Sequence, residues 1–299
     1  MTRDLDGLVP QISVVVNIWG KDSPISLKRS LSSIKSQTTK PSEVIVVVDG
    51  PINDLLEKVV AGFQKDNDFE VRIIRISEPT GLWNGRNKGI EVAKNEFIAV
   101  HDADDVMHPM RLEIQLKEFE LGNIDVLGSP VLEFDCVSEV IRGLRCLGAT
   151  GKVSKSLLWR NIINHSSVTF RKSAVIKAGG YRDVHLAEDY DLWLRMYALG
   201  YEIVNSEYVL QALSIDQDFI NRRGGFKFIK SELQIHRVVR STKVLKNIEL
   251  LLRLVLRLIF RLGPGWLRQL FKRTRQIKDL NSNYTKLDEF ITFQPMSMN

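Results

Sequence analysis

The chain has 299 residues, 44% of them hydrophobic and 26% charged, which suits globular domains and excludes a disordered, collagen-like or coiled-coil protein. Two cysteines, Cys136 and Cys146, are too few for a disulfide framework, and residues 1–11 lack an apolar run, so we expect a reducing compartment and no secretory signal. The net charge of +6 is uneven, because residues 227–278 hold fourteen Lys or Arg against two Glu; such a basic tail favours an anionic membrane or a nucleic acid as partner.

Buried strands alternate with helices over the first 130 residues. Runs of Val and Ile predict the strands, and the first helix has Ser23 as its expected N-cap and Pro24 at its first position. The expected strands cover 12–16, 44–48, 71–76 and 97–100, and the expected helices cover 24–37, 52–63 and 82–94. This order is typical of an α/β fold with a mainly parallel central sheet flanked by helices, whose ligands bind beyond the carboxyl ends of the strands.

The second half is less regular. Its expected elements are strands at 126–134, 167–170 and 208–214 and a helix at 187–199. From about residue 216 the pattern predicts long basic helices that break at Gly263-Pro264-Gly265, and we expect the last twenty residues to be polar and loosely held. The chain is therefore predicted to have two parts, an α/β domain at 1–215 and a basic helical region at 216–299.

The strongest chemical signal is the acidic cluster Asp102-Ala103-Asp104-Asp105, directly after a buried strand. Carboxylates this close repel one another unless a cation or hydrogen-bond donors lie between them. Mg²⁺ and Mn²⁺ prefer oxygen ligands and can bridge a diphosphate, so Asp102 and Asp104 are candidates for holding a metal-bound nucleotide. A solvated turn that caps the following helix is the alternative.

Two further residues follow neighbouring strands. Asp49 could accept a hydrogen bond from a uracil or thymine ring, and the ring of Trp19 could stack on that base. The alternatives are an ordinary turn aspartate in Asp-Gly-Pro and a partly buried core tryptophan.

A second acidic cluster, Glu188-Asp189-Tyr190-Asp191, opens the predicted helix at 187–199. Acids are favoured in a first helical turn by the helix dipole, which is the structural alternative. A carboxylate at a distance from a metal-held diphosphate is also what a direct sugar transfer needs, since it can take the proton of the attacking hydroxyl. We expect Asp49, Asp104 and Asp189 to surround one cavity.

Six segments occur in an order that resembles a known family. They are Ile12–Val16, Val46–Gly50, Gly81–Gly89, Asp102–Asp105, His165–Val175 and Gly179–Trp193. Over about residues 10–275 the chain resembles family 2 glycosyltransferases of the GT-A fold, in particular those of bacterial capsule, O-antigen and amylovoran-type exopolysaccharide synthesis. Trp19-Gly20 stands where that family often has Tyr-Asn, which leaves the donor base open.

The resemblance implies roles for individual residues. It implies that Asp49 contacts the base, Asp102 the ribose side and Asp104 the divalent cation, Mn²⁺ or Mg²⁺, with the diphosphate. Asp189 matches the general base of an inverting transfer. Arg86 is expected to face the donor phosphates or, alternatively, to form a surface salt bridge.

Four residues are weaker candidates. Glu188 precedes the expected base, and His165 matches a frequent family histidine that could touch the acceptor or the metal, although a core or capping histidine is the simpler reading. Arg222 and Arg223 precede two glycines and could clamp a diphosphate when a loop closes, or form a solvated hinge.

Residues 244–262 predict an amphipathic helix with thirteen apolar positions and six polar positions that fall on one side. A spanning helix is not expected, because it would place three arginines in hydrocarbon at about 2.5–3.5 kcal/mol each. We expect a helix that lies in the plane of an anionic membrane with its basic residues toward the lipid head groups, the alternative being a core helix packed on the sheet.

Together these features predict an inverting, metal-dependent glycosyltransferase on the inner face of a bacterial cytoplasmic membrane. It would move a sugar from a nucleotide-sugar donor, expected to be a UDP-sugar, to a lipid-linked saccharide acceptor of a surface polysaccharide. No nucleic-acid partner is expected. The alternatives are a sugar nucleotidylyltransferase, whose glycine-rich basic loop after the first strand is missing here, and a non-enzymatic adaptor that uses the tail.

Overall fold

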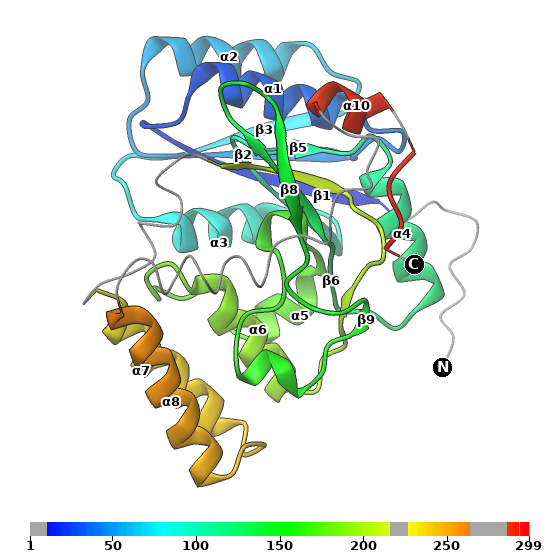
Figure 1. The fold of residues 1–299 in the computed structure, drawn as a ribbon. Helices are drawn as coiled ribbons and strands as arrows, with labels where there is room; N and C mark the ends of the chain where they lie inside the picture. The colour runs from blue at the N-terminus through cyan, green and yellow to red at the C-terminus, as the bar shows by residue number, and fades with distance from the viewer. Residues whose placement is uncertain (1–10, 216–226, 264–285, 293, 299) are drawn as a thin grey trace.

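The computed structural model describes residues 11–215, 227–263, 286–292 and 294–298. Its first half alternates strands and helices as the apolar pattern predicts (Figure 1). The elements are β1 (Ile12–Trp19), α1 (Pro24–Lys35), β2 (Glu43–Asp49), α2 (Asp54–Lys65), β3 (Glu70–Ile76), α3 (Leu82–Val92), β4 (Phe97–Asp102), β5 (Val106–Met107) and α4 (Arg111–Leu121). The Ser23 hydroxyl accepts a hydrogen bond from the Ser26 amide, which confirms the predicted N-cap.

The second half is built from shorter pieces. They are β6 (Val126–Gly128), β7 (Val131–Asp135), β8 (Ile141–Arg145), β9 (Gly151–Lys152), the 3₁₀ turns η1 (Lys155–Leu158) and η2 (His165–Ser167), β10 (Thr169–Arg171), α5 (Lys172–Lys177), α6 (Glu188–Ala198), β11 (Ile203–Asn205) and β12 (Gln211–Ile215). The strand expected at 126–134 is wrong as one element. It is interrupted at Ser129-Pro130, where proline has no amide proton to continue a ladder, and its halves belong to different sheets.

The central sheet has eight strands in the order β3-β2-β1-β4-β10-β6-β11-β9. The predicted parallel arrangement holds for β1 to β4, whereas β10 runs antiparallel between β4 and β6. Helices α1, α2 and α4 cover one face and α3, α5 and α6 cover the other (Figure 1). Each face has its own apolar core, so the strands are buried on both sides as their continuous apolar runs predict.

A smaller sheet has the strand order β5-β12-β7-β8. Strand β5 comes directly after the acidic turn that follows β4, and it pairs with β12. Because Ser214 of β12 donates its amide to the buried Asp105 carboxylate (2.9 Å), this sheet is held against the end of β4.

The C-terminal helices are α7 (Lys227–Ser241), α8 (Asn247–Leu262) and α10 (Leu287–Thr292). Helix α8 ends at Gly263, in agreement with the predicted break. The expectation that the last twenty residues are loosely held is wrong for those described, because Leu287 and Phe290 are buried and Phe290 packs on His108 with ring centroids 5.1 Å apart. No helix among the residues described is long and apolar enough to cross a membrane.

The basic side of α8 faces the protein, which corrects the expectation that its arginines face lipid head groups. Arg253 is fully buried and donates from Nε to the Leu158 carbonyl (2.6 Å). Arg257 and Arg261 both pair with Glu232 of α7, at 2.6 and 2.8 Å. The three arginines share one face of the helix as predicted, and that face points inward.

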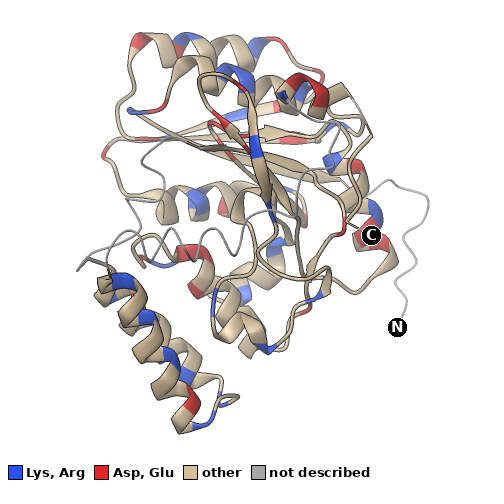
Figure 2. Cartoon of the chain, viewed as in Figure 1, with Lys and Arg blue, Asp and Glu red and all other residues tan. Residues whose placement is uncertain are grey.

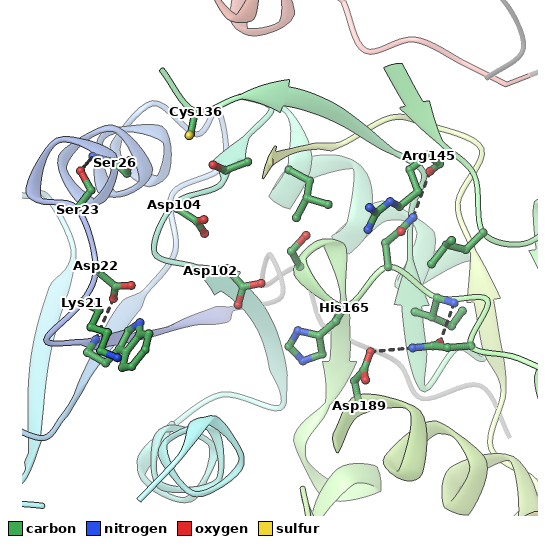
Figure 3. A pocket seen from close by; sticks show the side chains of 18 residues that line it. Lys21, Asp22, Ser23, Ser26, Asp102, Asp104, Cys136, Arg145, His165 and Asp189 are labelled. Carbon is green, nitrogen blue, oxygen red and sulfur yellow. Dashed lines mark hydrogen bonds between the residues drawn. The ribbon is translucent and has the colours of Figure 1, made fainter. Parts of the chain in front are cut away.

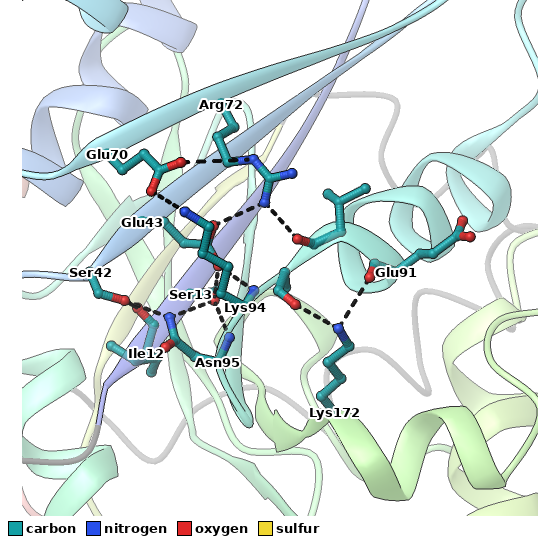
Figure 4. Close-up of polar contacts among 12 residues, drawn as sticks. Ile12, Ser13, Ser42, Glu43, Glu70, Arg72, Glu91, Lys94, Asn95 and Lys172 are labelled. Carbon is teal, nitrogen blue, oxygen red and sulfur yellow. Dashed lines mark hydrogen bonds and ion pairs between the residues drawn. The ribbon is translucent and has the colours of Figure 1, made fainter.

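At the amino end of the sheet lies a closed polar network around Glu43 (Figure 4). The buried Glu43 carboxylate accepts hydrogen bonds from the Ser13 hydroxyl (2.7 Å), the Lys94 amide (2.5 Å) and the Arg72 guanidinium (3.3 Å). The Asn95 side chain donates to Ser13 in turn (2.9 Å). These bonds tie the starts of β1, β2 and β4 together, and they lie at the opposite edge from the carboxyl ends of the strands.

Candidate functional site

A pocket of about 490 Å³ opens beyond the carboxyl ends of β1 and β4 (Figure 3). The β1–α1 and β4–β5 turns form one wall, and β8, β12 and the segment from η1 to η2 form the other. Its lining residues are Trp19, Lys21, Asp22, Ser23, Ser26, Asp102, Asp104, Cys136, Arg145, Leu147, Asn161, Ile163, Asn164, His165, Ser166, Asp189, Leu213 and Ser214. Five predicted site residues are therefore brought together: Trp19, Asp102, Asp104, His165 and Asp189.

Three carboxylates, those of Asp22, Asp102 and Asp104, lie on the first wall. Figure 3 shows Asp22 and Asp104 on one side of the pocket, Asp189 on the other and Asp102 between them. Parallel pairing of β1 with β4 sets Asn17 opposite Asp102, so the turns after both strands meet at the same edge. The Trp19 amide donates to Asp22 (2.9 Å), which folds the β1–α1 turn so that the Asp22 carboxylate faces the acidic turn.

The electrostatics of this wall are unfavourable in the absence of a cation. Loss of hydration, with a smaller effect of the Asp102 charge, raises the pKa of Asp22 to about 6. Loss of hydration and the charges of Asp102 and Asp22 raise the pKa of Asp104 to about 6. Carboxylates that resist ionisation because they crowd one another are stabilised when a positive charge is added.

This donor set fits a divalent cation. It offers oxygen ligands only, and Mg²⁺ in particular is commonly bound by one or two carboxylates with substrate phosphates completing the shell. Within the ranges described, no three His, Cys, Asp or Glu side chains form a complete metal site. A cation here would therefore be held by Asp104, with Asp102 or Asp22, together with a bound ligand.

Asp189 lies in the first turn of α6 and faces the pocket from the other wall. Its carboxylate accepts a hydrogen bond from the Asn161 side chain (2.8 Å) and is half-buried. Glu188, its neighbour, does not line the pocket; burial raises its pKa. The two acids of this turn therefore differ in position, and only Asp189 is open to a substrate.

His165 forms the floor between the two walls. Its Nε2 is 2.9 Å from the Tyr181 hydroxyl, and its ring stacks near Trp193 with centroids 6.3 Å apart. Burial and the charges of Arg86 and Arg111 hold its pKa well below the usual range, so the ring is neutral at pH 7. A neutral imidazole with one nitrogen on Tyr181 suits a hydrogen-bonding role better than a charged one.

Arg86 lies in α3 beneath the acidic wall and does not line the pocket. Its guanidinium is buried, 3.4 Å from Asp102, and lies over the Tyr181 ring at 5.6 Å. The alternative considered for Arg86, a salt bridge, is present, but it joins the buried guanidinium to the partly exposed Asp102 and does not lie on the surface. From this position Arg86 supports the Asp102 carboxylate from below.

Asp49 lies at the end of β2, opposite Trp19 of β1 in the ladder, but it does not line the pocket. Its carboxylate accepts hydrogen bonds from the Thr80 amide and hydroxyl (2.8 and 3.0 Å) and from the Gly81 amide (2.9 Å). Only two of the three acids expected around one cavity, Asp104 and Asp189, share it. Asp49 holds the turn before α3, where Gly81 has a φ of 93°.

Trp19 is 47% exposed at the pocket mouth, so it is not a core tryptophan. The Lys21 ammonium lies 5.3 Å from its ring centroid. The open ring suits the predicted stacking role. Arg222 and Arg223 fall outside the described residues.

Several lining residues were missed from the sequence. Asp22 could have been found, because it lies in the turn after β1, at the same end of the sheet as Asp49 and Asp102. Asn161 and Asn164 come from an irregular segment of the second half, and Arg145 ends β8, a short strand that no periodic pattern marked. Arg145 pairs with the buried Glu133 and enters the pocket from β8.

Comparison with known proteins identifies the fold and the family. Residues 13–178 match the model of the family described as glycosyl transferase family 2. The chain belongs to this family. It is 32% identical over 266 residues to the amylovoran biosynthesis glycosyltransferase AmsE of Erwinia amylovora, covering 88% of this chain and 99% of that one. It is 28% identical over 259 residues to an Escherichia coli UDP-Gal:alpha-D-GlcNAc-diphosphoundecaprenol beta-1,3-galactosyltransferase, covering 85% and 92%.

Solved structures share the GT-A fold of this family 2 chain. Residues 1–349 of S. aureus TarS in complex with UDP-GlcNAc superpose with a TM-score of 0.65 at 16% identity, over 84% of this chain and 72% of that one. The match to another S. aureus TarS structure spans only 43% of that chain. The mannosyltransferase PcManGT of Pyrobaculum calidifontis, in complex with GDP-Man and Mn²⁺, superposes with a TM-score of 0.60 at 17% identity, over 89% and 74%. The α/β sheet predicted from the apolar pattern is confirmed as this fold.

Proposed function

We propose that the protein is an inverting, cation-dependent glycosyltransferase that acts in the synthesis of a bacterial surface polysaccharide. The observation that carries the proposal is the placement of Asp104 and Asp189 on opposite walls of one pocket in a family 2 chain. One wall can hold a nucleotide-sugar and the other a proton acceptor. Membership of the family also favours a transferase over the nucleotidylyltransferase and adaptor alternatives.

The donor would bind along the acidic wall. A divalent cation, Mn²⁺ or Mg²⁺, would neutralise the diphosphate of the leaving nucleotide. Asp104 would hold this cation, Asp102 would contact the ribose side, and Arg86 would keep Asp102 in place. The open ring of Trp19 would stack on the base, and Lys21 beside it would face the phosphates. Asp49 would act by holding the Thr80–Gly81 turn near the base site.

The acceptor would bind against the second wall. Asp189 would accept the proton of the attacking hydroxyl, and Asn161 would fix the carboxylate through its hydrogen bond. One displacement at the anomeric carbon then inverts its configuration. His165 would donate or accept a hydrogen bond at the floor, since it is neutral. The curated relatives act in amylovoran synthesis and on a diphosphoundecaprenol acceptor, so we take a lipid-linked saccharide as the acceptor class and a UDP-sugar as the first donor to test.

We also propose that the chain keeps its two expected parts, a catalytic part at 1–215 and a basic helical part at 216–299. A lipid-linked acceptor stays in the membrane, so the enzyme would work as a peripheral protein on the inner face of the cytoplasmic membrane.

The test is a binding and turnover screen over UDP-, GDP- and dTDP-sugars with and without Mn²⁺ or Mg²⁺. Asp104→Ala should abolish cation-assisted binding of the accepted donor, while Asp189→Asn should bind it normally and fail to transfer. Asp68→Asn, which changes an exposed surface acid, is the control. It should bind the donor and transfer the sugar as the wild type does. Donor binding that is independent of any cation, and unchanged in Asp104→Ala, would refute the assignment of the acidic wall.

A further inference from the structure

Helix α8 carries an exposed apolar face. Contacts on the opposite side of the helix fix the direction in which this face points. The residues of this face, here called the α8 outer face, are Ile248, Leu251, Leu252, Val255, Leu256, Ile259 and Leu262. Each is between 44% and 70% exposed. Their spacing of three and four residues places them along one side of the helix. A contiguous exposed apolar strip of this kind marks an interaction site.

The opposite face of α8 is polar and locked. Arg257 donates to Glu232 from Nε and Nη2 (3.1 and 2.6 Å), and Arg261 donates to the same carboxylate from Nε (2.8 Å). Burial acts to raise the pKa of Glu232, but the two guanidinium groups outweigh it and the pKa lies below its usual range. Arg253 fixes the helix to the Leu158 carbonyl of η1. Rotating α8 would leave the buried Glu232 carboxylate without its two arginine partners, so the apolar side stays outward.

The charges around this face indicate its partner. Figure 1 shows α7 and α8 as a hairpin that projects from the body of the protein, and Arg237, Arg240, Lys243 and Lys246 are exposed at the end of α7 and the start of α8. Figure 2 shows Lys and Arg positions, in blue, along the same hairpin. The only acid within α8 is Glu249, whose carboxylate accepts the Lys246 amide of its own helix (2.7 Å). A second copy of α8 thus offers these cations no complementary charge, whereas lipid phosphates do.

The sequence that follows α8 is also basic and contains apolar residues. Residues 264–278 contain Trp266, five Lys or Arg and no acid. Apolar residues bordered by cations and an indole are the composition of a segment that binds at a membrane interface.

We propose that the α8 outer face inserts into the interface of a lipid bilayer, so that apolar burial carries membrane binding and anionic lipid only adds to it. The proposal rests on the proposed function only for the choice of a membrane as the place of work. It changes one role expected from the sequence: the three arginines of α8 hold the helix to the protein instead of facing lipid head groups, while the leucines still face the lipid.

The test is flotation of the full chain with vesicles of phosphatidylcholine alone and of phosphatidylcholine with phosphatidylglycerol. The wild type should float with both and more strongly with the mixed vesicles. The double variant Leu252→Glu, Leu256→Glu should bind both at least about tenfold more weakly, since two side chains lose their apolar burial. The matched control Leu55→Glu, Leu121→Glu changes two leucines that are 60% and 89% exposed on α2 and α4, and it should float like the wild type.

A charge variant separates the two contributions. Lys243→Glu, Lys246→Glu should lose only the extra binding to mixed vesicles, and high salt should have the same effect. Binding that needs phosphatidylglycerol and disappears in salt would overturn the proposal, as would flotation that is equal in Leu252→Glu, Leu256→Glu. So would a wild type that does not float.

Two further readouts keep the result interpretable. Sedimentation velocity without lipid should show a monomer; a dimer that Leu252→Glu, Leu256→Glu dissociates would assign the face to a second copy and overturn the proposal. Nucleotide-sugar binding should be the same in all variants, because they lie outside the pocket. Failure to float with intact donor binding refutes the membrane inference alone, whereas absent donor binding in the wild type refutes the proposed function.

Discussion

The two edges of the central sheet use carboxylates in opposite ways. At the amino edge, Glu43 accepts bonds from Ser13, Arg72 and the Lys94 amide, so its charge is compensated within the protein. At the carboxyl edge, Asp22 and Asp104 lie beside Asp102, and the pKa of each is raised to about 6. The first arrangement stabilises the fold, because the Glu43 charge is paired. In the second, the carboxylates repel one another, and a bound cation would reduce that repulsion. Carboxylate burial alone therefore does not identify a site; the absence of compensation does.

The largest effect is expected from removing Asp189, the acid that the described residues place on the opposite wall. Asp189→Asn should lower the transfer rate by about 10³-fold, within the usual range for loss of a general base, and leave donor affinity unchanged. Initial rates and donor titration measure the two effects. Glu188→Gln, the neighbour outside the pocket, should lower the rate by less than about tenfold. Normal turnover by Asp189→Asn would show that another group takes the proton.

Breaking the Glu43 network at the amino edge should lower the stability of the protein without changing its transfer rate. Glu43→Ala leaves Arg72 and the Lys94 amide without their buried acceptor, so we expect the free energy of unfolding to fall by about 3 kcal/mol. Chemical denaturation measures it, and kcat of the folded fraction should not change. Glu70→Gln, which removes an exposed partner of Lys94, is the control and should cost less than about 1 kcal/mol. An equal cost for both variants would contradict the distinction.

At the carboxyl edge, removing an acid should raise the free energy of unfolding instead of lowering it. The pKa of Asp22 in the folded protein is about 6 against an ordinary 3.8, so the free energy of unfolding falls as the pH rises from 3.8 to about 6 and does not recover above it. With a chelator present, Asp22→Asn should therefore raise the free energy of unfolding at pH 7.5 by about 1–2 kcal/mol and by nothing near pH 3. Unfolding curves across this range test it. Asp68→Asn, an exposed acid, should show no such pH-dependent gain.

The smallest expected effect concerns Asp49. Asp49→Asn places an amide against one of the donors of the Thr80–Gly81 turn, so we expect a loss of about 1 kcal/mol in stability and a rise in KM for the donor with little change in kcat. Thr80→Val, which removes only the hydroxyl bond, should have a smaller effect of the same kind. A fall in kcat with KM unchanged would contradict a positioning role for Asp49.

Much of the fold was predictable, because local pattern and topology agree in the first half. Val- and Ile-rich runs set the parallel strands, and the acids after β4 lie at a strand end as expected. In the second half, short strands such as β9 and β11 are held by neighbours distant in the chain, so no local period marks them. For the same reason Asn161 and Arg145 were missed. Asp22 was missed although it lies just after a strand that the sequence does predict.

The sequence by itself determined the α/β architecture, the family and the face of α8 on which its arginines lie, since these depend on periodicity and on ordered motifs. Only the tertiary structure decided that Asp49 supports a turn outside the pocket, that Asp22 joins the acidic wall, and that the α8 arginines point inward. Helical periodicity assigns residues to a face but not the direction in which that face points. The direction depends on partners outside the helix, the buried Glu232 carboxylate of α7 and the Leu158 carbonyl, which residues 244–262 alone could not reveal.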